Sequence, residues 1–242
     1  MELVRYSERP DLVDAYRSAL GETWPEFLRH DPISIAFHDR GVRLFPEFDL
    51  LLIEGDEVLA NAWAAPMTWD GSVPDLPDGY DGALVRAVEG HDAGTAPTTL
   101  CVMYVKVAKT HGSRGLAGRI LAGMRDAAAD AGLDHVVVPV RPTSKHRYPL
   151  QSMEEYASWR RPDETSIDPW IRTHERMGAK MLGVAKRSMV IPGTTAEWER
   201  WTGLTFPSTG DYVVPEALSP VHADHDAGTA TYVEDNLWMQ HA

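Results

Sequence analysis

The chain has 242 residues, of which 43% are hydrophobic and 24% charged, so it can bury a full core without disulfides or metal ions. Its formal net charge of -13 argues against a nucleic-acid binder and against a binder of anionic membranes, because both depend on a positive field. Cys101 is the only cysteine, which excludes an intrachain disulfide and a zinc site made of several cysteines.

Residues 1–16 lack the basic and apolar segments of a signal peptide, and no run of about 18 apolar residues occurs in the chain. We therefore expect a soluble, cytoplasmic protein with no membrane partner. The excess of Arg over Lys, together with abundant Ala, Gly and Asp, is typical of a high-GC bacterial genome, so we also expect a bacterial source.

The first half of the chain predicts a short opening strand, a helix over 10–20, and helix and loop over a pocket in 23–48. Residues 48–66 predict a hairpin around Gly55 and Asp56, because two apolar or alternating runs flank a turn dipeptide. A loop rich in Gly and Pro and a short helix follow.

The centre of the chain predicts strand, helix and strand. Residues 98–108 are β-branched and mostly apolar, residues 114–131 repeat apolar positions on one helical stripe, and residues 134–142 form a buried strand. If the two strands are parallel neighbours, the crossover is right-handed. Residues 168–178 predict a further helix with Asp168 as N-cap, and the last 35 residues or so predict edge strands or a wrapping tail.

The stretch "VKVAKTHGSRGLAGRIL" at 105–121 leads a strand into a helix through small residues. Such a turn leaves backbone N–H groups unpaired at the positive end of the helix dipole, where phosphate binds. The alternative is that these glycines serve packing alone.

In this context the turn resembles the coenzyme A pyrophosphate motif of the GNAT acyltransferase superfamily, Gln/Arg-x-x-Gly-x-Gly/Ala, which matches residues 112–117. Gly112 replaces the usual Gln or Arg, and Arg114 and Arg119 could supply the lost charge. A second landmark of the family, Leu-Tyr-Glu-x-Leu-Gly-Phe, resembles "THERMGA" at 173–179, with His174 in the place of Tyr.

The resemblance implies an α/β fold with a mixed, mostly antiparallel central sheet and helices on both faces. It implies one domain over 1–242, with a core of about 1–190, an insertion after the strand near 135–140 and a C-terminal extension of about 191–242. It also implies acetyl-CoA or another acyl-CoA as co-substrate, with no metal. The residues expected to bind this co-substrate are Val105 and Val107, by backbone pairing with the pantetheine arm, and Gly112, Ser113, Arg114, Gly115, Leu116, Ala117 and Gly118, around the pyrophosphate.

His174 is the catalytic candidate. It shares a helical face with Trp170 and Met177, so it should point inward, and imidazole can act as general acid or base near neutral pH. The alternative is a packed core histidine. The resemblance implies that family members with a carboxylate base on a strand would hold it near Cys101, and this sequence has no acid there. Direct attack by an amine that is deprotonated through water is therefore expected. Cys101 itself is interpreted as a buried core thiol.

Residues 143–167 combine cationic and aromatic side chains, which could hold a carboxylate-bearing substrate or the 3′-phosphate of coenzyme A. The alternative is a solvated loop whose cations pair with its own acids. "WPEFL" at 24–28 could form the opposite wall, and Trp63 and Trp69 could be wall or core. The substrate-binding candidates are Arg147, Tyr148, Trp159 and Trp24.

His222, Asp224 and His225 lie in an acidic tail without a predicted helix or strand to hold them in place, so they do not predict a metal site. The sequence therefore predicts an acyl-CoA-dependent N-acyltransferase that moves acetyl to an amine of a small molecule, and it leaves a homodimer open. Two alternatives remain: a non-catalytic GNAT-shaped protein that binds acyl-CoA or another ligand, and an acyltransferase that uses an acyl carrier protein or a hydroxyl acceptor.

Overall fold

The computed structural model describes residues 1–21, 24–109 and 115–241. Gly112, Ser113 and Arg114 of the expected pyrophosphate motif lie outside these ranges. The strands are β1 (Glu2–Arg5), β2 (Asp49–Glu54), β3 (Glu57–Met67), β4 (Thr99–Val107), β5 (His135–Val140), β6 (Lys180–Thr194), β7 (Gly210–Tyr212), β8 (Val221–Asp224) and β9 (Thr229–His241). The α-helices are α1 (Val13–Leu20), α2 (Pro32–Leu44), α3 (Gly79–Asp92), α4 (Leu116–Asp130), α5 (Met153–Ser158), α6 (Pro169–Arg176) and α7 (Thr195–Thr202).

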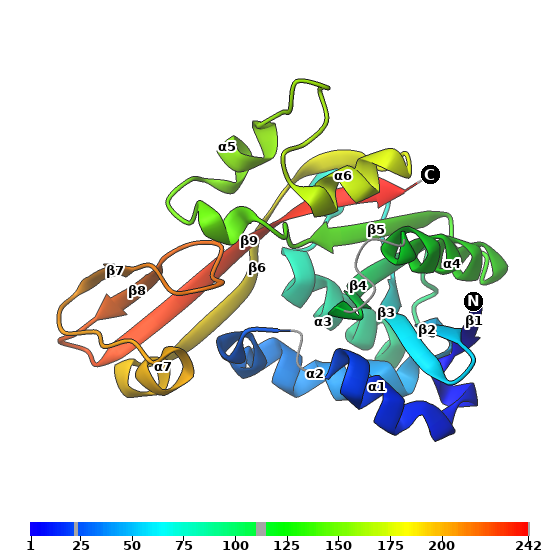
Figure 1. Ribbon diagram of the computed structural model, residues 1–242, viewed down its shortest axis with the longest axis horizontal. Coiled ribbons are helices and arrows are strands. Elements are labelled where there is room, and N and C mark those ends of the chain that lie inside the picture. Colours follow the sequence, from blue (N-terminus) through cyan, green and yellow to red (C-terminus); the bar gives the residue numbers. More distant parts are fainter. Residues whose placement is uncertain (22–23, 110–114, 242) are drawn as a thin grey trace.

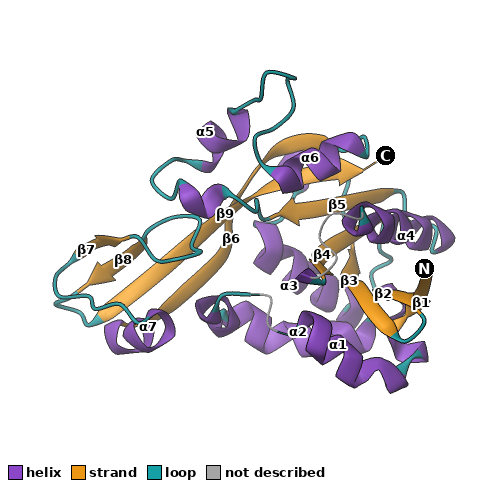
Figure 2. Ribbon diagram, in the orientation of Figure 1, coloured by secondary structure: helices purple, strands orange, loops and turns teal. Residues whose placement is uncertain are grey.

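The strands of the described chain form one mixed sheet in the order β1-β2-β3-β4-β5-β9-β8-β7, with β6 also paired to β9. The β4–β5 pair is parallel and the other pairs are antiparallel. Helices pack around this sheet (Figure 2). The expected fold class, the hairpin around Gly55 and the β4-α4-β5 crossover are therefore confirmed.

The C-terminal strand β9 lies inside the sheet, so the prediction of edge strands or a wrapping tail is wrong for it. Its second half pairs with β5 on one side and with β6 on the other. Leu237, Trp238 and Met239 are buried in the same core as β3 and β4. Three consecutive apolar residues are typical of a strand that is covered on both faces, and the sheet of the core thus continues to His241.

The two faces of the sheet are covered by different helices. On one face, Tyr16 of α1 donates a hydrogen bond of 3.3 Å to Asn61, and Gly41 of α2 lies so close to Trp63 that a Cβ would be 3.0 Å from its ring. Helices α4 and α6 contact each other on the opposite face, across the sheet from α1, α2 and α3 (Figure 1). Trp63 and Trp69 are buried, which confirms that both belong to the core.

Strands β4 and β5 pair over three residues and then part. Thr99–Cys101 pairs with His135–Val137, after which β4 continues along β3 while β5 continues along β9. Cys101 is fully buried at the point where the strands part, and burial raises the pKa of its thiol. This agrees with its interpretation as a buried core thiol. Beyond this point no described strand pairs with the β5 side of β4.

Candidate active site

A cavity of about 570 Å³ opens on the α2–α3 face where β4 and β5 part. Both strands line it, and the rest of the wall comes from the segment before α2, from α2 itself, from the start of α3, and from β6 and β9. Its lining residues are Trp24, Leu28, Arg29, Ser34, Ile35, His38, Asp39, Tyr80, Met103, Tyr104, Lys106, Pro139, Arg141, Met189, Glu234 and Asn236.

A buried ion pair closes the β9 side of this cavity. Nε of Arg141 lies 2.9 and 3.1 Å from the two carboxylate oxygens of Glu234. The same carboxylate accepts a hydrogen bond of 2.7 Å from the hydroxyl of Tyr232 and one of 2.9 Å from Nδ2 of Asn236. Because every bond that Glu234 can readily accept is made by the protein, this pair contributes little net charge to the cavity.

Lys106 contributes a cation from the β4 side. Its Nζ lies 3.4 Å from the hydroxyl of Tyr16 and 4.9 Å from the centre of the Tyr104 ring. Among the described residues no carboxylate oxygen lies within 4.0 Å of this Nζ. Burial lowers the pKa of Lys106. The charge of Asp49 opposes this shift, and the nearby cation of Arg29 adds to it.

Two phenols also line the cavity. Burial raises the pKa of Tyr80 and of Tyr104 well above the ordinary value for tyrosine. Both hydroxyls therefore stay protonated at neutral pH, so they can donate a hydrogen bond or a proton but cannot remove one as phenolates.

His174 lies on the opposite face of the sheet. Side chains of a strand point alternately to its two faces, and the indole of Trp238 donates to the carbonyl of Pro77, which precedes α3. Trp238 therefore lies on the α3 face of β9. Met239 and His241 lie on the other face, so His241 faces α6 and not the cavity. Nδ1 of His174 lies 2.8 Å from Nε2 of His241. Burial lowers the pKa of His174 to about 3 and that of His241 to about 4, so both are neutral at pH 7. The expected inward orientation is confirmed, and the catalytic role stays a prediction.

The insertion after β5 stands apart from this cavity. Lys145 is 1% exposed, and its Nζ donates to the carbonyls of Tyr148 and Leu218 at 2.8 and 2.7 Å. Arg147 is exposed, and Tyr148 and Trp159 pack edge to face with ring centres 5.0 Å apart. Of the four substrate-binding candidates, Trp24 lines the cavity, whereas the lining does not include Arg147, Tyr148 or Trp159.

The described part of the expected cofactor cradle lies at the start of α4. Leu116, Ala117 and Gly118 form its first turn, and Gly115 precedes them with a φ of 68°, a conformation that favours glycine. Among the described residues, no atom lies within 4 Å of where a Cβ on Gly115 would be. Val105 and Val107 lie on the part of β4 beyond the point where β5 leaves it, as an added pantetheine strand would require.

Six polar residues of the cavity were not among the site residues expected from the sequence. Their signal was weak but present, since polar residues at every second position of a strand mark one face of it. Lys106 follows Tyr104 in this way on β4, and Glu234 and Asn236 do so on β9. The remaining two are Tyr80 and Arg141.

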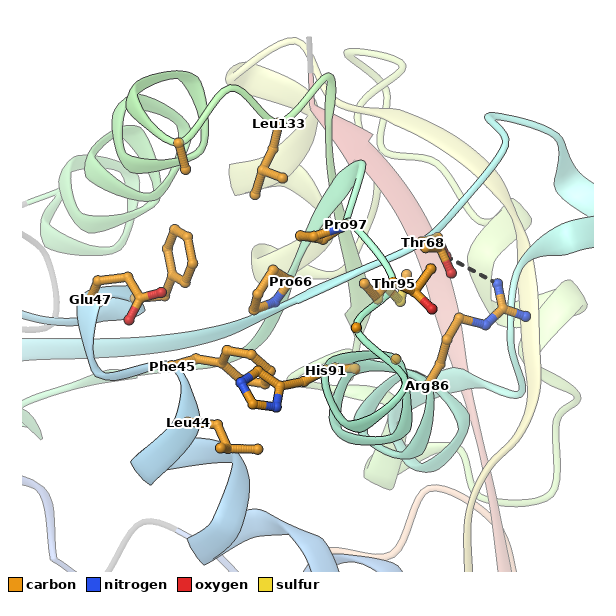
Figure 3. A pocket seen from close by; sticks show the side chains of 16 residues that line it. Leu44, Phe45, Glu47, Pro66, Thr68, Arg86, His91, Thr95, Pro97 and Leu133 are labelled. Atoms are coloured by element: carbon orange, nitrogen blue, oxygen red, sulfur yellow. Dashed lines mark hydrogen bonds between the residues drawn. The ribbon is translucent and has the colours of Figure 1, made fainter.

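A second cavity of about 510 Å³ lies beside the segment that precedes β4, at the N-terminal end of that strand (Figure 3). Pro66, Pro97 and Leu133 line it, together with Arg86. Arg86 is engaged by the carbonyls of Thr68 and Asp75. This cavity lies before the segment in which β4 and β5 pair, and the two strands part after that segment. The second cavity is therefore not adjacent to the point where the strands part.

In the described ranges no group of three or more His, Cys, Asp or Glu side chains could hold a metal ion. His222 instead lies 2.7 Å from Asp211, in an exposed pair. None of the described helices is both long and apolar enough to span a bilayer.

No family model matches the chain. An arginine N-acetyltransferase of the fungus Aspergillus versicolor is 31% identical over 265 residues, which cover 96% of this chain and 91% of that protein. The GphF GNAT-like decarboxylase, solved in complex with isobutyryl-CoA, superposes with a TM-score of 0.58 at 16% identity and covers 100% of this chain and 99% of its own. The loading GNATL domain of CurA from Lyngbya majuscula gives 0.56 at 15% identity, with coverage of 99% and 96%.

These two solved structures are similar to this chain in fold, and at such low identity they show no shared reaction. The similarity to the fungal enzyme extends over nearly the whole of both chains. The chain therefore belongs to the GNAT superfamily and is an N-acetyltransferase, as the two sequence landmarks had led us to expect.

Proposed function

We propose that the protein transfers an acetyl group from acetyl-CoA to an amine of a small molecule bound in the 570 Å³ cavity. The observation that carries this proposal is the parting of β4 and β5 after Cys101 and Val137, directly beside that cavity. An acyl thioester lying between the two strands would present its carbonyl carbon to an acceptor in the cavity.

The donor would approach from the α4 side of the sheet. The free edge of β4 is suited to the amide groups of the pantetheine arm, and the N-terminus of α4 is suited to the pyrophosphate. Gly115 supports this placement because no atom of the described residues occupies the space where its side chain would be.

The reaction needs one bond formed and one broken. The amine nitrogen bonds to the carbonyl carbon, the C–S bond breaks, and the thiolate of coenzyme A leaves. The proton of the attacking ammonium goes to water, and the thiolate takes a proton from a donor of the site. We propose Tyr80 and Tyr104 for that donation, because both residues line the cavity and their hydroxyls stay protonated. His174 remains the alternative, from the opposite face.

Arginine is the first acceptor to test, since the fungal relative is named for it. The test incubates the protein with acetyl-CoA and with arginine or a panel of other amines, and it follows release of free thiol and the mass of the product. We expect thiol release that depends on the acceptor, together with an N-acetylated product.

Two results would contradict the proposal. A lack of acetyl-CoA binding at millimolar ligand would exclude the enzymatic reaction. Binding without thiol release across the whole panel would instead favour a ligand-binding protein.

A further inference from the structure

Lys106 is a cation inside the proposed acceptor cavity, and none of the ion pairs of the described residues joins it to a carboxylate. The Nζ of this partly buried residue lies against two aromatic rings, 4.9 Å from the centre of Tyr104 and 5.8 Å from that of Tyr16, and 3.4 Å from the Tyr16 hydroxyl. In the part of the chain that the structure describes, no carboxylate lies within 4.0 Å of it. Removing a charge from water without pairing it is unfavourable, and an anionic ligand group would offset that cost.

Three acids lie in or beside the cavity, and none of them contacts Nζ of Lys106 within 4.0 Å; one of the three, Asp39, is an exposed residue of the lining. Glu234 lines the same cavity, but Arg141, Tyr232 and Asn236 occupy its oxygens. Asp49 is 5% exposed and accepts a hydrogen bond of 2.7 Å from Asn61, and burial raises its pKa to about 6. The charge of Asp49 favours the charged form of Lys106 and raises its pKa, but the carboxylate does not reach the ammonium, so Nζ keeps hydrogen-bonding capacity for a ligand.

A second cation adds to the positive field on the same side. Arg29 lines the cavity near Lys106, and its own partner Glu26 lies 3.7 Å away at the exposed rim. Repulsion between the two cations disfavours the charge on Lys106, and an anion bound between them would relieve it.

We propose that Lys106 binds the carboxylate of the acceptor, so that the enzyme selects amino acids over amines that lack a carboxylate. The inference rests on the proposed function and adds the substrate class to it. The carboxylate would accept hydrogen bonds from Nζ of Lys106, while the amine of the same molecule lies toward the point where β4 and β5 part.

The experiment compares amino acids with their decarboxylated amines: arginine with agmatine, lysine with cadaverine and histidine with histamine. For each pair kcat/KM is measured on the wild type, on Lys106→Met, which keeps the length of the side chain, and on Lys106→Arg. Lys186→Met is the matched control, since Lys186 is an exposed lysine whose partners Glu154 and Asp235 lie outside the cavity lining.

We expect the wild type to prefer the amino acid of at least one pair. In Lys106→Met that preference should fall by roughly 10- to 100-fold, because a charged hydrogen bond is lost, while kcat/KM for the amine stays within about threefold. Lys106→Arg should restore part of the preference, and Lys186→Met should leave it unchanged.

The proposal is overturned if the wild type accepts the amines as readily as the amino acids, or if Lys106→Met keeps the preference. It is also overturned if Lys106→Met lowers kcat equally for both classes, since that result would make Lys106 an acid–base group. Calorimetric binding of arginine and agmatine in the presence of coenzyme A gives a readout that does not depend on turnover. Binding of arginine that depends on Lys106 in a protein without turnover would support this inference while refuting the proposed function, and equal binding of both probes would refute the inference.

Discussion

Two regions of this molecule combine cations with aromatic rings, and the structure uses them differently. In the insertion after β5, the ammonium of Lys145 is enclosed and satisfied by two backbone carbonyls, and Arg160 pairs with Glu175 of α6. In the cavity beside β4, Lys106 has rings and one hydroxyl around it, and among the described residues no carboxylate oxygen lies within 4.0 Å of its Nζ. The first lysine holds the chain together, and the second is available to a ligand.

This difference shows that composition alone does not identify a binding surface. A cation gains a functional role when the fold leaves its charge uncompensated and accessible, and it loses that role when backbone or carboxylate oxygens already occupy it. The predictions below test this contrast, beginning with the largest expected effect.

Breaking the ion pair that closes the cavity should have the largest effect on stability. In Glu234→Gln the guanidinium of Arg141 loses its buried counter-ion, and we expect a loss of about 3–5 kcal/mol in the free energy of unfolding. Urea denaturation measures this. If the double variant Glu234→Gln/Arg141→Met recovers part of the lost stability, the loss comes from the unpaired charge of Arg141. A loss below about 1 kcal/mol in Glu234→Gln would contradict this explanation.

Exchanging the two lysines for methionine tests the contrast itself. Lys145→Met leaves two buried carbonyls without a donor, so we expect a loss of about 1–3 kcal/mol in stability and an unchanged KM for the acceptor. Lys106→Met should leave the melting temperature nearly unchanged and raise the KM for an amino acid. Reversal of these outcomes would reverse the assignment of the two regions.

Acid should destabilise the protein through His174 and His241. In the folded chain the pKa is about 3 for His174 and about 4 for His241, and both values lie below the ordinary 6.5. At a pH between the folded pKa and 6.5, the unfolded state therefore binds more protons than the folded state. Stability is therefore full above pH 6.5 and falls as the pH drops, by about 1.4 kcal/mol per pH unit for each group. Unfolding curves at several pH values should show a shallower slope in His174→Gln, and an unaltered slope would count against this origin.

Turnover of folded His174→Ala decides whether this histidine also acts in catalysis. As a general acid or base its loss would lower turnover by roughly 10²- to 10⁴-fold with little change in acyl-CoA affinity. As a packed residue on the far face its loss would lower the melting temperature and leave the specific activity of the folded fraction near that of the wild type. The placement of His174 away from the cavity favours the second result.

The smallest effect is expected in the insertion surface. Arg147 is exposed and does not line the cavity, so Arg147→Ala should change the KM for the acceptor by less than about twofold and stability by less than about 0.5 kcal/mol. Steady-state kinetics measures the first quantity. A tenfold rise in KM would return the acceptor site to the insertion, as the sequence had predicted.

The sequence predicted those elements whose signals are local. The hairpin around Gly55, the helix that starts at Leu116 and the Asp168 cap of α6 follow from turn residues, periodicity and capping. The position of β9 depends on pairing with strands that lie far away in the chain, and no local pattern encodes that choice.

The acceptor cavity escaped prediction for the same reason. Its walls join β4, β5 and β9, and the state of each charge depends on partners that are distant in sequence, as Glu234 is for Arg141 and Asn61 is for Asp49. Trp24 was found because it lies in an aromatic segment near a predicted pocket. Lys106 was missed because a single lysine in an apolar strand carries no local motif.

The most direct test of the donor site compares two glycines at opposite ends of α4. Gly115 has a φ of 68° and Gly132 a φ of 70°, and a Cβ at either position meets no atom of the described residues within 4 Å. Valine at each should therefore cost about 1–2 kcal/mol of backbone strain, and the two variants should lose similar stability. Calorimetry with acetyl-CoA should then show at least about a tenfold weaker affinity for Gly115→Val than for Gly132→Val, because the branched side chain introduced by Gly115→Val would fill the space proposed for the pyrophosphate. Equal affinity in the two folded variants would contradict a cofactor site at the start of α4.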